Sequence, residues 1–142
     1  METEKGVAVP HTRKILIVDD EEIFADNLKS YCARCGWDSL VACTGKLAVS
    51  AAADFLPEVI LLDYRLPDMN GFDVLEAIRA ANPRCPCVLM TGHPAETVRA
   101  GAQRHGIERI LYKPFSLSDM DAALAGAAAD FSAASGGAVP RQ

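Results

Sequence analysis

Short runs of consecutive apolar residues recur along this chain, and segments with helical spacing of apolar residues lie between them. The run ILIV at 15–18 has no polar residue on either face, which is typical of a parallel strand that is buried on both sides. Comparable runs at 59–62, 87–90 and 109–112, with a weaker one at 37–42, predict five strands that alternate with five helices. This alternation favours a doubly wound α/β fold with a five-stranded parallel sheet in the order 2-1-3-4-5.

Residues that end or begin helices support this division of the chain. Gly36 stands where a C-cap glycine would end the first helix, and Thr44 is a candidate N-cap for the second. The pair Asn82-Pro83 is expected to end the third helix, because a residue before proline is disfavoured in helical conformation. The predicted helices therefore have recognisable ends as well as apolar faces.

Length and charge restrict the class of protein. The 142 residues suit one domain, which we expect at 13–132, with flexible segments at 1–12 and 133–142. The formal net charge is −5 and there is no block of lysine and arginine, which argues against direct nucleic-acid binding. No apolar stretch approaches the ~20 residues needed to cross a bilayer. The first residues also lack the apolar core of a secretory signal, so we expect a cytoplasmic location without membrane association.

Five cysteines raise the question of a metal or redox site. Cys32 and Cys35 form a C-x-x-C pair, and Cys85 and Cys87 form a C-x-C pair. However, Cys32 and Cys35 share the helical spacing of nearby apolar residues, so we expect both to face the core as small hydrophobic side chains. Cys87 begins a predicted strand, and the odd number of cysteines argues against a set of disulfides. We therefore interpret the cysteines as structural.

Polar side chains gather at the carboxyl ends of the predicted strands. Asp19 and Asp20 follow the first strand, and Asp63 follows the third. Thr91 follows the fourth strand and Lys113 the fifth. In the predicted order the first and third strands flank the topological switch point, where sheets of this type bind ligands. Three carboxylates in one pocket repel one another unless a cation or a proton relieves them, and Mg²⁺ suits oxygen ligands combined with waters and phosphate.

Asp63 is the candidate reacting group of this pocket. A carboxylate can form an aspartyl phosphate, and a cation together with Lys113 would neutralise the charge that develops on a transferred phosphoryl group. The Thr91 hydroxyl could hydrogen-bond a phosphoryl oxygen. Each motif alone has an ordinary explanation, since Asp19-Asp20 could cap a helix and Asp63 could start a turn. Their joint placement at adjacent strand ends favours phosphoryl chemistry.

Four motifs carry a family resemblance: ILIVDD at 15–20, LLDYRLPDMNG at 61–71, MTGH at 90–93 and LYKPF at 111–115. Together, in this order, they resemble the receiver domain of two-component response regulators, which has a flavodoxin-like fold. The resemblance covers about positions 13 to 132, which is the whole of the predicted domain. It implies that Asp63 accepts a phosphoryl group from a sensor histidine kinase or a phosphotransfer protein.

The resemblance also implies a metal site. Mg²⁺, or another divalent cation such as Mn²⁺, would be bound by Asp20, Asp63 and the backbone carbonyl of Arg65, with Asp19 acting through water. Asp68 lies in the following loop, and we expect it to be solvated or to cap a helix rather than to bind the cation.

The remaining roles implied by the resemblance concern the phosphoryl group. Thr91 and Lys113 would hold it, and the Lys113-Pro114 peptide bond would be cis, which would bend the chain and direct the lysine into the pocket. Arg65 and His93 occupy positions that influence how fast the phosphoryl group is lost.

Receivers usually carry an aromatic residue three positions before the lysine, and its rotation follows phosphorylation. Here that position is Ile110, while the aromatic residue is Tyr112, directly before the lysine, and we expect it on the opposite pleat of the strand. A displacement of Thr91 could still be transmitted by repacking of Ile110. The surface that switches, which is also a candidate homodimer contact, would comprise the helix at 94–105, the strand at 109–112 and the final helix.

Two other functions use related features. A haloacid-dehalogenase-like phosphatase also has an aspartate at a strand end, but it needs a second acid two residues later, where this chain has Arg65. A degenerate receiver that serves only as an interaction domain would not need the complete set of polar residues. We therefore expect a signalling module rather than an enzyme, one that catalyses at most its own phosphotransfer and slow dephosphorylation.

Overall fold

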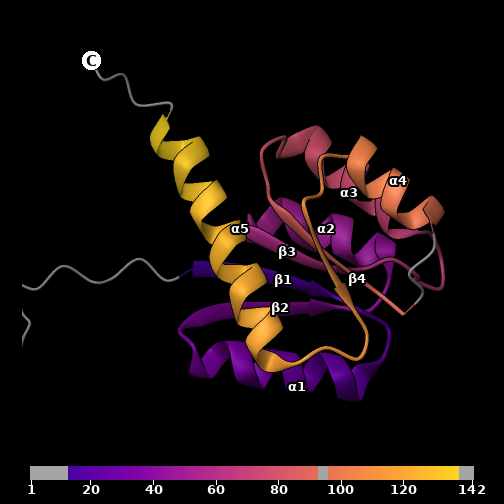
Figure 1. The fold of residues 1–142 in the computed structure, drawn as a ribbon, viewed down its shortest axis with the longest axis horizontal. Coiled ribbons are helices and arrows are strands. Elements are labelled where there is room, and N and C mark those ends of the chain that lie inside the picture. The colour runs from indigo at the N-terminus through magenta and orange to yellow at the C-terminus, as the bar shows by residue number, and fades with distance from the viewer. Residues whose placement is uncertain (1–12, 93–95, 138–142) are drawn as a thin grey trace, which may run out of the picture.

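The strands and helices of the computed structural model alternate as the apolar runs predict (Figure 1). The structure describes residues 13–92 and 96–137, so the predicted flexible segment at 1–12 and residues 138–142 of the other one lie outside these ranges. The strands are β1 Arg13–Val18, β2 Trp37–Ala42, β3 Val59–Asp63, β4 Cys87–Thr91 and β5 Arg109–Tyr112. The helices are α1 Glu22–Arg34, α2 Gly45–Phe55, α3 Gly71–Ala81, α4 Glu96–Arg104 and α5 Leu117–Gly137.

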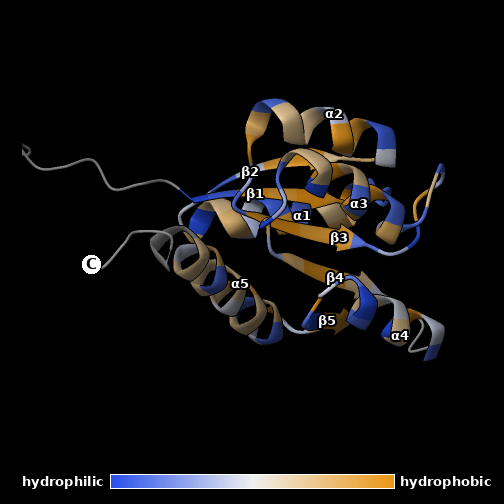
Figure 2. Cartoon of the chain, turned by 90° about the horizontal axis from the view of Figure 1, so that it is seen from above, coloured by the Kyte–Doolittle hydropathy of each residue, from blue (hydrophilic) through white to orange (hydrophobic). Residues whose placement is uncertain are grey.

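All five strands are parallel, and their order in the sheet is β2-β1-β3-β4-β5, as predicted. Successive side chains of a strand point to opposite faces, so each strand contributes to two cores. Leu16 and Val18 of β1 pack in the core formed with α2, α3 and α4, whereas Ile15 and Ile17 pack in the core formed with α1 and α5. Figure 2 shows the central strands β3 and β4 as strongly hydrophobic segments between the helices. Burial on both faces explains why these strands have uninterrupted apolar sequences.

The predicted helix ends are present. The side chain of Thr44 accepts a hydrogen bond from the backbone N–H of Leu47 (3.1 Å), which is the expected N-cap of α2. Gly36 has a φ of +91°, a conformation that suits glycine after the end of α1. At the start of α5, the Ser116 hydroxyl accepts a hydrogen bond from the backbone N–H of Asp119 (2.9 Å).

Helix α5 continues to Gly137, so residues 133–137 are helical rather than part of a flexible tail (Figure 1). The last large apolar residue of the helix is Phe131, but the residues that follow include alanines, which favour helix without needing a buried face. The guanidinium of Arg84 also donates to the backbone carbonyl of Ala134 (3.4 Å). Within the described ranges, no helix is both long and apolar enough to cross a membrane.

The prediction for one cysteine was wrong. Cys32 is buried as expected, but Cys35 is exposed, because α1 ends at Arg34 and Cys35 stands at its C-cap, off the buried face. Burial raises the pKa of the Cys85 and Cys87 thiols to about 12, which keeps them protonated and unreactive. All five cysteines are free thiols, in agreement with the absence of a disulfide framework.

Candidate functional site

The parallel pairing of β1 and β3 brings the predicted acids together. Val18 and Leu62 are register partners, so the residues that follow them, Asp19 and Asp63, lie side by side at the carboxyl edge of the sheet. Ligand oxygens of Asp19, Asp20 and Asp63 all lie within 4.8 Å of one another. Asp19 is fully buried and Asp63 is 7% exposed, whereas Asp20 faces solvent. The three carboxylates predicted from the strand ends therefore form one cluster.

Lys113 reaches this cluster from the end of β5. Its Nζ lies 2.9 Å from Asp19 Oδ2 and 3.4 Å from Asp63 Oδ2. A third carboxylate, that of Glu21, lies 3.3 Å from the same Nζ. The ammonium also sits over the ring of Phe24, 4.6 Å from its centroid. The contacts of Glu21 and Phe24 were not predicted, and the only signal for Glu21 is its place directly after the acidic pair.

The charges of the cluster are unbalanced. Burial, and then repulsion by Asp19, raise the pKa of Asp63 to about 6, although the positive charge of Lys113 opposes this shift. Burial acts to lower the pKa of Lys113, but hydrogen bonding to Asp19 and the negative charges of Asp63 and Asp19 outweigh it and hold that pKa above its ordinary value. Lys113 is therefore a permanent cation at neutral pH, while the negative charge of Asp63 is only partly compensated.

The donor set fits a hard divalent cation. The cluster offers carboxylate oxygens close together, and its repulsion is not relieved by the one ammonium. Such cations prefer oxygen ligands, and a partly exposed edge leaves space for the waters that they retain. Exposure of Asp20 beside two buried aspartates gives the cluster this open side.

Thr91 and Arg65 border the same pocket. Thr91 ends β4 and is 3% exposed, and its carbonyl oxygen accepts a hydrogen bond from the backbone N–H of Lys113 (2.8 Å). The backbone N–H of Arg65 donates to Asp63 Oδ1 (3.3 Å). The Lys113-Pro114 peptide bond is cis, as predicted. His93, the other predicted modulator, lies outside the described residues.

The loop after β3 is held by its own polar residues. Asp68 accepts hydrogen bonds from the backbone N–H groups of Gly45 (2.8 Å) and Lys46 (2.9 Å) at the start of α2. These two bonds hold the pKa of Asp68 below its ordinary value. The backbones of Arg65 and Asn70 form an isolated antiparallel β-bridge across the loop. Asp68 is thus a capping residue, as expected, and the acidic cluster of Asp19, Asp20 and Asp63 does not include it.

A chain of rings begins one residue after Asp63, and no pattern in the sequence predicted it. Tyr64 packs edge-on against Phe72 of α3, with centroids 5.2 Å apart. Phe72 stacks on His105, which follows α4, with centroids 4.7 Å apart and an interplanar angle of 4°. The Phe72 ring also fills the space above Gly101 of α4, where any side-chain carbon would collide with it. We call Tyr64, Phe72 and His105 the ring stack.

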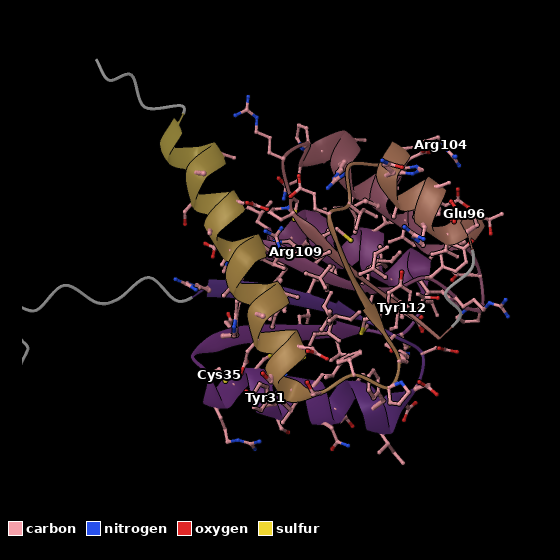
Figure 3. The ribbon with its side chains drawn as sticks, in the orientation of Figure 1. Tyr31, Cys35, Glu96, Arg104, Arg109 and Tyr112 are labelled. Atoms are coloured by element: carbon pink, nitrogen blue, oxygen red, sulfur yellow. The ribbon has the colours of Figure 1, made fainter. Side chains whose placement is uncertain are left out.

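The predicted switch residue Ile110 is half-buried and packs against the core that contains α2, α3 and α4. Tyr112, two residues later on β5, is 39% exposed. Figure 3 shows Tyr112 on β5, with Glu96 and Arg104 on the neighbouring α4. The expectation that Tyr112 lies on the opposite pleat from Ile110 was wrong, because residues two apart point to the same face of a strand. Tyr112 is exposed because it is the last residue of β5, which is an edge strand.

Comparison with known proteins agrees with this geometry. The family described as the response regulator receiver domain matches residues 15–125. Regulatory protein LuxO of Vibrio vulnificus is 39% identical over 98 residues, which are 69% of this chain and 22% of LuxO. The probable transcriptional regulatory protein TcrX of Mycobacterium tuberculosis is 36% identical over 106 residues, which are 75% of this chain and 45% of TcrX. The chain thus spans less than half of the length of these relatives.

Solved structures show the same fold. A CheY-like receiver domain protein from Methanospirillum hungatei superimposes with a TM-score of 0.81 at 22% identity, over 85% of this chain and 97% of that one. The receiver domain of a LuxO repressor protein from Vibrio parahaemolyticus gives a TM-score of 0.79 at 26% identity, over 85% and 93% of the two chains. The match to the family over most of the chain, together with the acidic cluster at the carboxyl edge of the sheet, shows that this chain belongs to the response regulator receiver domains of two-component signalling.

Proposed function

We propose that this chain is a phosphoacceptor module in which Asp63 receives a phosphoryl group from a sensor histidine kinase or a phosphotransfer protein. The observation that carries the proposal is the position of Asp63: a nearly buried carboxylate, 3.4 Å from the Lys113 ammonium and beside two further carboxylates. Its catalysis is confined to its own phosphorylation and slow dephosphorylation. We place this activity in the cytoplasm, without direct contact with membrane or nucleic acid.

In the proposed reaction, a carboxylate oxygen of Asp63 attacks the phosphorus of a phosphohistidine. An O–P bond forms while the N–P bond breaks, and the imidazole nitrogen keeps the electron pair of that bond and takes up a proton. Lys113 stabilises the negative charge of the phosphoryl oxygens, and the Thr91 hydroxyl donates a hydrogen bond to one of them.

A divalent cation, Mg²⁺ or Mn²⁺, would supply further positive charge to the phosphoryl oxygens. We propose that Asp20, Asp63 and the backbone carbonyl of Arg65 hold it, and that Asp19 acts through a water. The support for this assignment is the mutual proximity of the three carboxylates. Arg65 and His93 are our candidates for residues that set the lifetime of the phosphoryl group.

We further propose that phosphorylation alters the surface formed by α4, β5 and α5. Helix α4 contributes only Val98, Gly101 and Ala102 to the buried interior, so it has few contacts to give up when it moves. Thr91 leads towards α4, and the ring stack joins the residue after Asp63 to the end of the same helix. The same surface is our candidate for a homodimer contact, because Glu96 and Arg104 of α4 give it charges of both signs (Figure 3).

Acetyl phosphate provides a direct test of the phosphoacceptor. The protein is incubated with acetyl phosphate and Mg²⁺, and its intact mass is measured. We expect one added phosphoryl group, no labelling when a chelator removes Mg²⁺, and no labelling of Asp63→Asn. Asp54→Asn is the matched control, because Asp54 is an exposed acid of α2 outside the acidic cluster and should leave labelling unchanged. Labelling of Asp63→Asn to the same extent as the wild type would refute the assignment.

A further inference from the structure

The ammonium of Lys113 has no unused hydrogen-bond donor. A lysine ammonium carries three N–H groups, and three carboxylate oxygens, from Asp19, Glu21 and Asp63, lie within 3.4 Å of Nζ. A phosphoryl oxygen that binds to this ammonium must therefore displace one of these three partners. Which partner leaves determines how readily the pocket accepts an anion.

Burial identifies the partner that can leave. The side chains of Asp19 and Asp63 are 0% and 9% exposed, so either carboxylate would lose the ammonium without gaining a hydration shell. The side chain of Glu21 is 64% exposed, and water can replace the ammonium when this carboxylate moves away. Ion pairs of exposed groups are also weak, so the contact with Glu21 is the cheapest of the three to break.

The backbone holds Glu21 where this contact forms. The backbone N–H of Glu21 donates to Asp19 Oδ1 (2.9 Å), and Glu21 is the N-cap residue of α1. On the other side, the ring of Phe24 supports the ammonium and is itself packed edge-on against Phe115, with centroids 5.9 Å apart. Lys113 therefore stays in place when Glu21 leaves, because the ring and the two buried aspartates still hold it.

We infer that Glu21 is a positioning residue. Its carboxylate occupies the N–H group of Lys113 that would bind a phosphoryl oxygen, until an anionic phosphodonor molecule displaces it. This inference rests on the proposed function of Asp63 and adds a competitor to its pocket. The Glu21 carboxylate lowers the apparent affinity for an anionic phosphodonor in two ways. It fills the third N–H of Lys113, and its negative charge repels the incoming phosphate.

The test compares Glu21→Gln with Glu22→Gln. Both variants remove one negative charge at the start of α1, but among the described residues no ion pair joins Glu22 to Lys113. Initial rates of labelling are measured over a range of acetyl phosphate concentrations in saturating Mg²⁺. We expect Glu21→Gln to lower the half-saturating concentration by about two- to fivefold, the factor for one weak ion pair, with little change in the limiting rate. Glu22→Gln should leave both values close to those of the wild type.

The two variants separate displacement from a general effect of net charge. The inference would be overturned by equal shifts in Glu21→Gln and Glu22→Gln, or by a higher half-saturating concentration in Glu21→Gln. In either case, labelling of Asp63 would still support the proposed function. A wild-type protein that acetyl phosphate does not label would overturn the proposed function, and the role of Glu21 with it. A circular dichroism spectrum identical to that of the wild type confirms that each variant is folded.

Discussion

Asp63 is held in an environment that disfavours its charged form in the absence of a cation. Its pKa is raised to about 6, first by burial and then by Asp19. Because the folded protein binds this proton more tightly than the unfolded chain does, the stability that Asp63 contributes is present at low pH and is lost as pH rises through about 6. The reactive carboxylate therefore destabilises the cation-free protein at neutral pH.

We predict that Asp63→Asn is more stable than the wild type at pH 8 without divalent cations, by on the order of 1 kcal/mol after screening by solvent. The gain should shrink as pH falls towards 4, where the wild-type carboxyl group is protonated. Urea unfolding in a chelator at pH 8 and at pH 4.5 measures both values. Asp54→Asn, at an exposed position of α2, is the control. A gain of the same size at both pH values would contradict the explanation.

The sequence predicted the residues of the pocket that directly follow an apolar strand. Asp19, Asp63 and Lys113 were identified because the strand order alone brings the ends of β1, β3 and β5 to one edge. Glu21 was missed because its contact with Lys113 depends on how the start of α1 is placed, and Cys35 was misplaced because α1 ends one residue before it. The place of a residue at the end of a strand is thus easier to predict than the contacts of a residue at the end of a helix.

At the scale of elements, the ring stack connects the pocket to α4. Strand β5 has no aromatic residue at position 110 that could do this. Tyr64 follows Asp63, Phe72 belongs to α3, and His105 follows α4. The Nε2 atom of His105 also lies 3.2 Å from Glu76 of α3. This connection could not be predicted from the sequence, because the contact between α3 and α4 depends on the fit of one ring over one glycine.

We predict that Phe72→Leu weakens the response of α4 to phosphorylation without slowing the labelling of Asp63. The smaller side chain removes two ring contacts worth roughly 0.5 to 1.5 kcal/mol each, so α4 should exchange its amide hydrogens faster even in the unphosphorylated protein. Hydrogen exchange over 96–112 is measured with and without beryllofluoride, which mimics an acyl phosphate. We expect the difference in exchange with and without beryllofluoride to be smaller in Phe72→Leu than in the wild type.

Tyr112→Leu is the matched variant for this experiment, since it removes an aromatic ring that is exposed and outside the ring stack. Its exchange pattern should match that of the wild type. If Phe72→Leu responds to beryllofluoride as fully as Tyr112→Leu does, the ring stack does not couple the pocket to α4, and repacking of Ile110 would be the remaining route.

At the scale of the whole molecule, the reacting groups lie at one edge of the sheet, so a donor protein must approach that edge. A shallow hollow lies there, lined by Ile23, Phe24 and other residues of the first turns of α1. Ile23 is 79% exposed, which is unusual for a large apolar side chain beside a charged pocket. We propose that the phosphorylated partner contacts the exposed side chain of Ile23 when it binds at this edge.

We predict that Ile23→Ala slows phosphoryl transfer from a phosphorylated kinase or phosphotransfer protein by about tenfold. This is the loss expected for a side chain that becomes buried in the complex. Labelling by acetyl phosphate should be unchanged, because this small donor needs no apolar surface. Leu56→Ala, at an exposed apolar position at the end of α2, is the control for the loss of a surface leucine. Equal slowing with both donors would place the effect in the pocket instead.

The hydrogen bonds of Asp68 have a consequence for the energetics of cation binding. Residues 64–71 would otherwise be a free connection, but Asp68 ties them to the start of α2, and the backbone N–H of Gly71 donates to the carbonyl of Tyr64 (2.7 Å). The conformational entropy of the loop is therefore lost during folding rather than during binding. Cation binding should release water and rearrange charge without ordering backbone, so its heat-capacity change should be small.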